Sequence, residues 1–327
     1  MSIDAQILAA LRAARNSGVS GAELSEKLGI SRAAIWARIE EMRKVGYDIQ
    51  ASPHFGYRLL SVPDVLHADD LRSRLPDVQV VGREIRVFQE TTSTNDVVER
   101  LARDGVKEGM VVFAESQTKG RGRLGRKWVS PPGKGLWFSV LLRPNFHPLF
   151  TTQLTVASAT ALIRAIRQQT NVQAEIKWPN DILIRGKKVC GVLTELSAEL
   201  DHVKYVILGI GVDVNLEASD FPPEVQHIAT SLRAESKQVI DRAELAAAIL
   251  RELDRDYARI CAGRFEQVAE EWQQQCSTIG NNVAIHVGDR VVHGRAEALD
   301  TDGALLLRTQ HGHLERIIGG DVTVQKS

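Results

Sequence analysis

The segment from Thr118 to Trp128, TKGRGRLGRKW, concentrates residue types that bind anions. Between Lys119 and Lys127 it holds five basic residues, three glycines and no acid. Glycines let a backbone approach a ligand closely, and guanidinium groups donate paired hydrogen bonds to carboxylates and phosphates. The segment therefore predicts a flexible anion-binding loop, mobile until a ligand orders it. A solvated basic surface loop is the alternative.

The glycines of this loop also match the spacing G-x-G-x-x-G, at Gly120, Gly122 and Gly125. A dinucleotide-binding loop with that spacing should open a helix. Two prolines follow within RKWVSPPGKG and forbid a helix there. The companion motifs of protein kinases, H-R-D and D-F-G, are absent from the sequence. We interpret the spacing as a coincidence.

Three further stretches carry candidate binding groups. TTSTND, from Thr91 to Asp96, clusters neutral hydrogen-bonding side chains. KWPND begins at Lys177 and leads into an RGKK turn, which places Lys188 at the start of a predicted strand. GIGVDVN puts two glycines on another predicted strand, where the missing side chains leave room for a ligand. Taken singly, each stretch is more often structural than functional.

The elements that position these residues begin with an N-terminal helix-turn-helix followed by a hairpin. Ile7, Leu8 and Leu11 have helical spacing in a first helix, and Ser20, Glu23 and Gly29 mark the ends of a second. Ser31 caps a third helix, whose apolar face consists of Ala34, Ile35, Ile39 and Met42. A turn of a hairpin is predicted from Ser52 to Gly56. Eight Lys and Arg against six Asp and Glu in residues 1–60 leave the segment weakly basic. The pattern favours a winged DNA-binding module, with a helical interaction module as the alternative.

The rest of the chain divides in two. After a linker near residues 61–68 and a short helix at 69–75, strand-like runs (85–90, 110–116, 136–142, 205–214) mix with helical ones (153–170, 242–260), which predicts an α+β domain. From Ser277 onward, short alternating runs separated by Gly and Asp predict a small all-β barrel. The expected domains are therefore 1–63, 64–276 and 277–327.

Composition excludes several classes of protein. Apolar residues make up 43%, charged residues 25%, and the net charge is zero, so whole-chain charge predicts no polyanion partner. No apolar run approaches the roughly 20 residues of a membrane helix, and the N-terminus lacks signal-peptide features. Three scattered cysteines, Cys190, Cys261 and Cys276, indicate reduced thiols, and the His311–His313 pair is too small for a structural metal site.

Taken together, the motifs resemble biotin protein ligases. TTSTND, ESQTKGRGRLGRKW, KWPNDILI, KKVCGVL and GIGVDVN occur in that family in this order, and ISRAAIWARIEEMRKVGYDI is similar to the DNA-binding module of its bifunctional bacterial members. The resemblance covers all three regions. It implies a winged helix-turn-helix, a central class II synthetase-like ligase domain and a C-terminal SH3-like barrel.

The resemblance also implies an activity. A member would be a biotin–[acetyl-CoA-carboxylase] ligase, in which the carboxylate of biotin attacks the α-phosphate of ATP, with Mg²⁺, to give biotinyl-5′-AMP. A lysine of biotin carboxyl carrier protein would then attack the adenylate. Such a protein would also be cytoplasmic, dimerise when adenylate-bound and repress the biotin operon by binding operator DNA.

Site residues follow from the resemblance, position by position. Lys188, Arg123 and Arg121 would be catalytic; Ser93, Thr94, Asn95, Gln117, Gly120, Arg121, Gly122, Arg123, Lys188, Gly191, Gly209 and Gly211 would bind biotin; Arg123, Arg126, Trp128, Asn180, Asp181 and Asn215 would bind the nucleotide; Ser31, Arg32, Trp36 and Arg38 would contact DNA. Metal ligands are left unassigned. Asp213 departs from the family pattern, which commonly has Asn, and as a carboxylate it would repel ATP phosphates.

Three alternatives stay open at this point. The chain could be a DNA-binding sensor of biotin that transfers poorly to carrier protein, and the weakly basic N-terminal module also allows a ligase that has lost its operator. A lipoate ligase-like enzyme is the third, although the GRGRLGRKW loop and the helix-turn-helix both speak against it.

Overall fold

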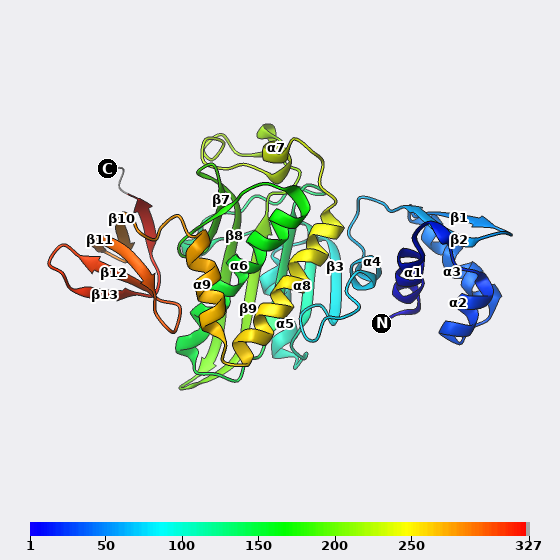
Figure 1. Cartoon of the computed structure of the whole chain (residues 1–327), viewed down its shortest axis with the longest axis horizontal. Helices are drawn as coiled ribbons and strands as arrows, with labels where there is room; N and C mark the ends of the chain where they lie inside the picture. Colours follow the sequence, from blue (N-terminus) through cyan, green and yellow to red (C-terminus); the bar gives the residue numbers. More distant parts are fainter. Residues whose placement is uncertain (325–327) are drawn as a thin grey trace. The chain divides into compact units, whose positions relative to one another are not determined.

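The computed structural model describes residues 1–324, which form two compact units. The first unit spans residues 1–78 and the second starts at residue 79 (Figure 1). The first is a helix-turn-helix with a hairpin, and the second combines a mixed sheet with a smaller antiparallel sheet. The predicted α+β multidomain class is confirmed, and the expected boundaries at 63/64 and 276/277 stay a proposal.

The first three α-helices of the first unit each begin where a serine caps them. They are α1 (Ile3–Ala14), α2 (Gly21–Leu28) and α3 (Arg32–Lys44), with a 3-10 turn η1 (Arg15–Ser17) between the first two. The hydroxyl oxygens of Ser2, Ser20 and Ser31 each accept a hydrogen bond from the backbone three residues on, which satisfies an otherwise free N–H. Gly29 ends α2 in the left-handed conformation, as the sequence predicts.

A hairpin completes the helix-turn-helix. Strands β1 (Asp48–Ser52) and β2 (Gly56–Ser61) pair antiparallel, so the predicted turn is confirmed. Gly56 has φ +73°, and a Cβ there would lie 2.2 Å from the carbonyl oxygen of Val19. The short helix α4 (Ala68–Ser73) packs against α1, where Asp70 accepts from both Arg12 and Arg74.

A seven-stranded sheet is the centre of the second unit. Its strands are β3 (Glu84–Thr91), β4 (Met110–Gln117), β5 (Leu136–Leu142), β6 (Glu175–Lys177), β7 (Asp181–Ile184), β8 (Lys187–Glu199) and β9 (His202–Val212). The spatial order is β3-β4-β5-β9-β8-β7-β6, and only the β3–β4 pair of this sheet is parallel. The predicted RGKK turn is confirmed, since Arg185 and Gly186 both take positive φ between β7 and β8.

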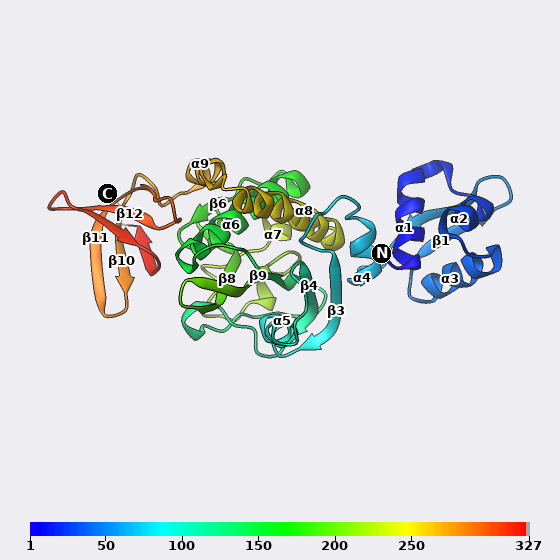
Figure 2. The same ribbon diagram turned by 90° about the horizontal axis from the view of Figure 1, so that it is seen from below.

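Helices cover both faces of this sheet, as Figure 2 shows. Helix α5 (Thr94–Arg103) packs on one face, while α6 (Thr151–Thr170), α8 (Arg242–Cys261) and α9 (Phe265–Gln275) lie on the other. Shorter turns are η2 (Arg123–Gly125), η3 (Pro148–Phe150), η4 (Ala218–Asp220) and α7 (Leu232–Ser236). Hydrogen bonds from one side chain connect the three helices on this face. The guanidinium of Arg164 on α6 donates to Glu252 and Asp256 on α8 and to Glu271 on α9.

One segment of this layer, Pro148–Thr170, is long and apolar enough to cross a membrane by length and composition. Its most apolar window is 72% buried inside the protein, between the sheet and α8. Burial in a core explains the apolar composition, as it does for the central helices of many water-soluble proteins.

The C-terminal part is a five-stranded antiparallel sheet. Its strands are β10 (Asn282–Val287), β11 (Arg290–Leu299), β12 (Leu305–Thr309), β13 (Leu314–Ile317) and β14 (Asp321–Val324), in the order β13-β12-β11-β10-β14. The sequence prediction of a small all-β domain is confirmed, and its closure into a barrel stays a prediction. Thr278 connects it to the large sheet, because its hydroxyl accepts from the Trp178 backbone.

Candidate active site

A pocket of about 1040 Å³ opens at one end of the seven-stranded sheet. It is lined by residues from α5, from the glycine- and arginine-rich loop at residues 120–128, from β7, β8 and β9, and from the C-terminal sheet. Most of the predicted site residues of the ligase domain are among them: Ser93, Thr94, Asn95, Gln117, Arg121, Gly122, Arg123, Arg126, Trp128, Asn180, Asp181, Lys188, Gly191, Gly209 and Gly211. The structure therefore brings together motifs that are scattered over more than 100 residues of sequence.

One end of the pocket is neutral and polar. Ser93, Thr94 and Asn95 are each almost fully buried at the start of α5. The carbonyl of Gln117 accepts from the Thr94 backbone at 2.9 Å, and its amide nitrogen donates to the Ser130 hydroxyl at 3.0 Å. These bonds fix which end of the Gln117 amide carries the oxygen. A neutral ligand group with both donors and acceptors suits such a site.

Glycines on β9 make room for this end. A Cβ on Gly209 would lie 2.3 Å from Asn95 Oδ1, and a Cβ on Gly211 would lie 2.7 Å from the Trp128 ring. Any larger residue would displace the two side chains that line the pocket there. The two glycines thus make room directly for the side chains of Asn95 and Trp128, and the predicted contact of these glycines with a ligand stays a prediction.

The glycine–arginine loop forms a small hairpin. The Gly122 backbone donates to the Arg126 carbonyl at 2.7 Å, and the Trp128 backbone donates to the Gly120 carbonyl at 2.9 Å. A 3-10 turn at residues 123–125 forms its tip, where Leu124 is 77% exposed. No α-helix follows β4 here among residues 1–324, which agrees with the rejection of a dinucleotide-binding loop. We call residues 120–128 the glycine–arginine hairpin.

Each arginine of this hairpin has partners from another part of the second unit. Arg121 pairs with Asp96 and Glu195, Arg126 pairs with Asp321, and Arg123 donates to Asn180 Oδ1 and to the Gly320 carbonyl, both at 3.2 Å. Burial lowers the pKa of Arg123, although a guanidinium stays protonated in proteins. Both of these acceptors of Arg123 are neutral, so its charge is available to an anion.

A second cation, Lys188, lines the same pocket and pairs with Asp181, the neighbour of Asn180 in the chain. Lys188 Nζ is 2.7 Å from Asp181 Oδ1, in an ion pair without hydrogen-bond alignment. The same ammonium lies 5.2 Å from the centre of the Trp128 ring, within range of a cation–π interaction. Gly191 faces both groups, since a Cβ there would lie 3.2 Å from Nζ. Arg123 and Lys188 thus offer two positive charges to one pocket.

Asp213 lies near these cations, and its carboxyl is only 5% exposed. Burial raises the pKa of this carboxyl well above its usual range, and the charge of Lys188 lowers it in part. Burial thus disfavours the charged form of this carboxyl. A neutral carboxyl resembles the amide of Asn in shape and hydrogen bonding and does not repel phosphates.

Two predicted site residues are not among those that line the pocket. Gly120 packs beneath the hairpin, where a Cβ would lie 2.5 Å from the Trp128 carbonyl. The side chain of Asn215 donates to the Ile240 carbonyl at 2.9 Å and accepts from the Ile240 backbone at 3.0 Å. Asn215 thus pins two loops together. Its nucleotide-binding role stays a prediction.

Sequence reasoning missed several residues of this region. Ser139 lies 2.7 Å from Thr94 Oγ1 and 2.5 Å from Asn95 Oδ1, so it supports the polar end from beneath. Its only signal in the sequence is a lone polar residue within the apolar run LWFSVLL. Gly320 and Asp321 reach the hairpin from the C-terminal sheet, and nothing local in the sequence indicates this approach.

The predicted DNA-contacting residues lie on or beside α3 in the first unit. Ser31, Arg32, Trp36 and Arg38 are all exposed, with Trp36 at 57%. Arg32 and Trp36 share a helix face, because they are four residues apart. Arg38 points elsewhere on the helix, 3.7 Å from Asp4. Their exposure leaves these side chains accessible to a partner, and their contact with DNA stays a prediction.

A cage for a metal ion does not occur in residues 1–324, since no three His, Cys, Asp or Glu side chains cluster suitably. A cation that is held mainly by a nucleotide needs only one or two carboxylates from the protein. Asp181 fits this need, because its carboxylate lines the pocket beside Asn180.

Comparisons with known proteins agree with this geometry. Models of the biotin/lipoate A/B protein ligase family, of a helix-turn-helix domain and of the biotin protein ligase C-terminal domain match residues 87–213, 4–58 and 278–324. A bifunctional ligase/repressor BirA from Bacillus spizizenii is 40% identical over 93% of both chains, and one from Escherichia coli is 30% identical over 94% of this chain and 93% of that protein.

A solved structure is similar as well. The biotin protein ligase from Aquifex aeolicus in complex with biotin and ATP has a TM-score of 0.64 and 30% identity, covering 75% of this chain and all of that one. Fold and site thus define a biotin/lipoate-type ligase that carries a helix-turn-helix. The chain belongs to the family of bifunctional biotin ligase/repressors.

Proposed function

We propose that this chain is an ATP-dependent biotin–[acetyl-CoA-carboxylase] ligase that works through biotinyl-5′-AMP and also represses the biotin operon in response to biotin. The observation that carries the ligase activity is the pocket itself. It places a neutral polar end at Asn95 next to two cations, Arg123 and Lys188. Biotin has a neutral ureido ring at one end and a carboxylate at the other, so it matches this order.

Binding of biotin would use the buried polar end. Ser93, Thr94, Asn95 and Gln117 offer donors and acceptors whose directions the surrounding bonds already hold. The predicted biotin set also includes Gly120, Gly122, Gly191, Gly209 and Gly211, which let the ligand approach the backbone. Preorganised groups of this kind lower the entropy cost of binding. The carboxylate of biotin would then point toward the cations.

Adenylation joins two anions, so their repulsion must be neutralised. The carboxylate oxygen attacks the α-phosphorus of ATP, the bond to the bridging oxygen breaks, and pyrophosphate leaves. Lys188 and Arg123 would supply positive charge around that phosphorus. Arg121, the third residue of the predicted catalytic set, pairs with Asp96 and Glu195 and would act by positioning the loop that carries Arg123. Trp128, Arg126, Asn180, Asp181 and Asn215 form the proposed nucleotide set. No side-chain nucleophile is needed, since the substrate's own carboxylate attacks.

Mg²⁺ would accompany ATP and neutralise its phosphates. Asp181 and Asn180 are the side chains that would hold it, beside the Arg123 guanidinium. The ε-amine of a lysine on biotin carboxyl carrier protein would then attack the carbonyl carbon of the adenylate. That amine loses a proton, and AMP leaves. A hairpin that covers the adenylate would slow its hydrolysis.

Repression would use α3 of the first unit. Ser31, Arg32, Trp36 and Arg38 would contact operator DNA. We further propose that the adenylate-bound chain forms a homodimer in the cytoplasm, so that two helix-turn-helix units meet successive major grooves of a palindromic operator. Biotin supply would then control transcription by linkage between adenylate binding and dimerisation.

The first experiment is to mix the protein with biotin, Mg²⁺ and α-labelled ATP and to measure bound biotinyl-adenylate. A carrier domain is then added, and loss of label is followed together with gain of biotin. Adenylate that forms and is consumed supports the ligase. Adenylate that forms but is not passed on favours a sensor, and adenylate with lipoate instead of biotin favours a lipoate ligase. Absence of any adenylate contradicts the proposal.

A further inference from the structure

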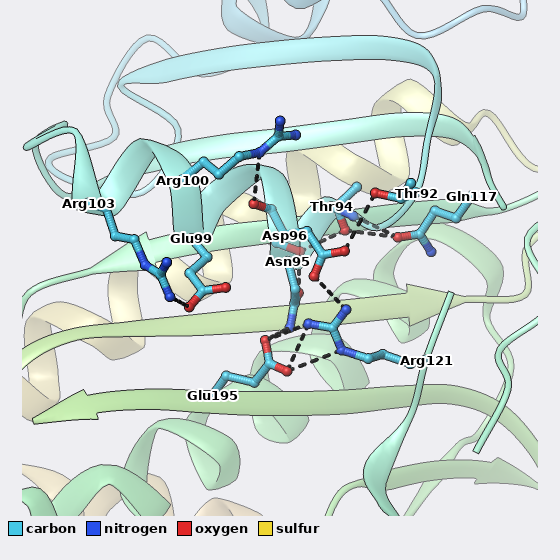
Figure 3. A network of polar contacts seen from close by, with 11 residues as sticks. Thr92, Thr94, Asn95, Asp96, Glu99, Arg100, Arg103, Gln117, Arg121 and Glu195 are labelled. Carbon is cyan, nitrogen blue, oxygen red and sulfur yellow. Dashed lines mark hydrogen bonds and ion pairs between the residues drawn. The ribbon is translucent and has the colours of Figure 1, made fainter. Parts of the chain in front are cut away.

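Glu195 joins two parts of the pocket that are far apart in the sequence. It lies on β8, and its side chain is 36% exposed. Its Oε2 accepts from Asn95 Nδ2 at 2.8 Å, and its Oε1 accepts from Arg121 Nη2 at 3.0 Å. These partners are 100 and 74 residues away along the chain. Figure 3 shows the three side chains converging from α5, the hairpin and β8. Asn95 and Arg121 line the pocket, whereas Glu195 lies behind them.

The first consequence concerns the amide of Asn95. Its oxygen accepts from Ser139 at 2.5 Å while its nitrogen donates to Glu195, so both ends are held. Asn95 is 3% exposed and Ser139 is fully buried, so water cannot replace either partner easily. One N–H and one lone pair of the amide stay available to a ligand. Without the Glu195 carboxylate, nothing opposes rotation of the amide to the wrong orientation.

The second consequence concerns the glycine–arginine hairpin. Arg121 lies at its base, where it bridges to Lys127, and its guanidinium also donates to Asp96 at 2.6 Å. Two carboxylates face this single guanidinium, so its charge is already neutralised before an anionic substrate arrives. Arg121 therefore serves as an anchor for the hairpin, while Arg123 keeps a charge for the substrate. The anchor sets the position from which Gly122 and Arg123 reach the pocket.

A partly exposed ion pair alone would carry little weight, since such pairs contribute little to stability. Glu195 differs because one of its two partners is the buried Asn95. A single carboxylate thus couples the orientation of the amide to the anchoring of the hairpin. Asn95 and the hairpin residues Arg121, Gly122 and Arg123 line the same pocket.

We propose that Glu195 is a positioning residue for biotin, holding the Asn95 amide in one orientation and anchoring the glycine–arginine hairpin through Arg121. This inference rests on the proposed function, because it assigns the polar end of the pocket to biotin. It predicts that losing the carboxylate weakens biotin binding selectively. ATP binding should be affected less, because the Asn95 amide is assigned to biotin alone and ATP would feel the change only through the hairpin residue Arg123.

The main variant is Glu195→Gln, which keeps the shape of the side chain. A glutamine keeps one acceptor oxygen but has no charge, and its NH2 group would face the Arg121 guanidinium in place of Oε1, which accepts two of the Arg121 bonds in Glu195. Asp96→Asn removes the other carboxylate from Arg121 but leaves the Asn95 bond intact. Glu199→Gln is the matched control, since Glu199 lies on the same strand and pairs with Lys204 away from the pocket. Biotin affinity is measured by calorimetry without ATP, and KM for ATP by pyrophosphate release.

We expect Glu195→Gln to raise the Kd for biotin by about tenfold or more, as for a lost hydrogen bond to a charged group, and to raise KM for ATP by a smaller factor. Asp96→Asn loosens the hairpin but keeps the Asn95 bond, so it should raise the Kd for biotin less than Glu195→Gln does, and Glu199→Gln should match wild type throughout. An unchanged biotin Kd in Glu195→Gln overturns the inference. Equal losses for biotin and ATP together with a lowered Tm also overturn it, because they indicate a general structural role.

A second measurement needs no ligand. Trypsin cleaves after Lys and Arg, and the hairpin contains Arg121, Arg123, Arg126 and Lys127. Loosened anchoring should speed cleavage within residues 120–128 in Glu195→Gln, and also in Asp96→Asn, at unchanged Tm. Wild-type cleavage rates in both variants would overturn the anchoring part. If wild-type protein binds no biotin at all, the proposed function fails and this inference fails with it. Normal wild-type binding with an unaffected Glu195→Gln overturns only the inference.

Discussion

The ammonium of Lys188 and the carboxylate of Asp181 face each other at 2.7 Å across the β7–β8 hairpin, and both line the pocket. The pair holds the lysine in place beside the Trp128 ring. The turn at Arg185 and Gly186 brings the two strands together, so a local feature of sequence creates the contact. A cation held in this way is preorganised for charge that develops on a phosphate.

Lys188→Ala should lower the rate of adenylation by roughly a hundredfold or more, the usual effect of removing a group that stabilises transition-state charge. The assay is pyrophosphate release with saturating biotin and ATP. Lys187→Ala is the matched control, because Lys187 is the exposed neighbour on the same strand. Wild-type pyrophosphate release from Lys188→Ala would remove this lysine from the mechanism.

Arg123→Ala should speed dissociation of the adenylate by about ten- to hundredfold, since hydrogen bonds to charged groups contribute about 1.5–3 kcal/mol. The Tm should change little, because the lost bonds are to Asn180 and one carbonyl at the edge of the pocket. Dissociation of labelled adenylate provides the measurement. Arg86→Ala, which breaks an exposed pair with Glu84, is the control. An unaltered dissociation rate would count against the role of Arg123.

Asp213→Asn should stabilise the protein increasingly as pH rises above about 4. Burial raises the pKa of the folded carboxyl above its unfolded value of 3.8, so wild type loses stability as pH climbs from that value toward the folded pKa. The Asp213→Asn variant has no carboxyl to titrate at this position, so it does not lose this stability as pH rises. Tm is compared from pH 5 to pH 8, where each kcal/mol corresponds to roughly 2–4 °C in a domain of this size. A pH-independent difference in Tm would show that Asp213 does not titrate in this way.

Asp220→Asn is a control for this experiment, because its effect on Tm should have the opposite sign to that of Asp213→Asn. Burial raises the pKa of Asp220, but the hydrogen bond from Lys134 and that from the Glu217 backbone lower it further, for a net decrease. Its charged form therefore stabilises the fold above the unfolded pKa, and that stability is lost as pH falls through the folded value. The variant should melt at a lower temperature across the same pH range.

Arg32→Ala should weaken binding to promoter DNA of the biotin operon without changing adenylation. Arg32 is exposed on α3 beside Trp36, in a unit separate from the pocket. Loss of one phosphate contact reduces the slope of log K against log salt by roughly one unit. Gel-shift titrations with biotin and ATP present, at several salt concentrations, measure this slope. Arg15→Ala, outside α3, is the control. Equal DNA affinity and slope in Arg32→Ala would exclude that contact.

Much of the fold could be predicted because its signals are local. Ser20 and Ser31 each cap a helix by accepting a hydrogen bond from the backbone N–H three residues later. The turn between β7 and β8 depends on the positive φ angles of Arg185 and Gly186. Amphipathic spacing located α1 and α8, and apolar runs located β4 and β5. Such features depend on neighbours within a turn or two of the chain, so the sequence alone determines them.

The binding motifs could also be recognised in the sequence, because each is a short run of residues with an unusual composition. Gly209 and Gly211 have side-chain-free surfaces that only a close partner explains, and Asn95 and Trp128 are those partners. The sequence could identify the glycines but could not say what they face. Asn215 illustrates the limit, since a residue within a binding motif turned out to have both ends of its amide engaged by Ile240.

The contacts that join the site were decided by tertiary structure alone. Glu195 meets Arg121 across 74 residues, Ser139 meets Asn95 across 44, and Gly320 meets Arg123 across 197. Strand order and register bring these groups together, and no local pattern encodes which carboxylate will face which guanidinium. The sequence by itself determined the elements, the motifs and the chemistry they could carry. Only the folded sheet decided which charges are neutralised and which stay available, because that depends on distances between segments remote along the chain.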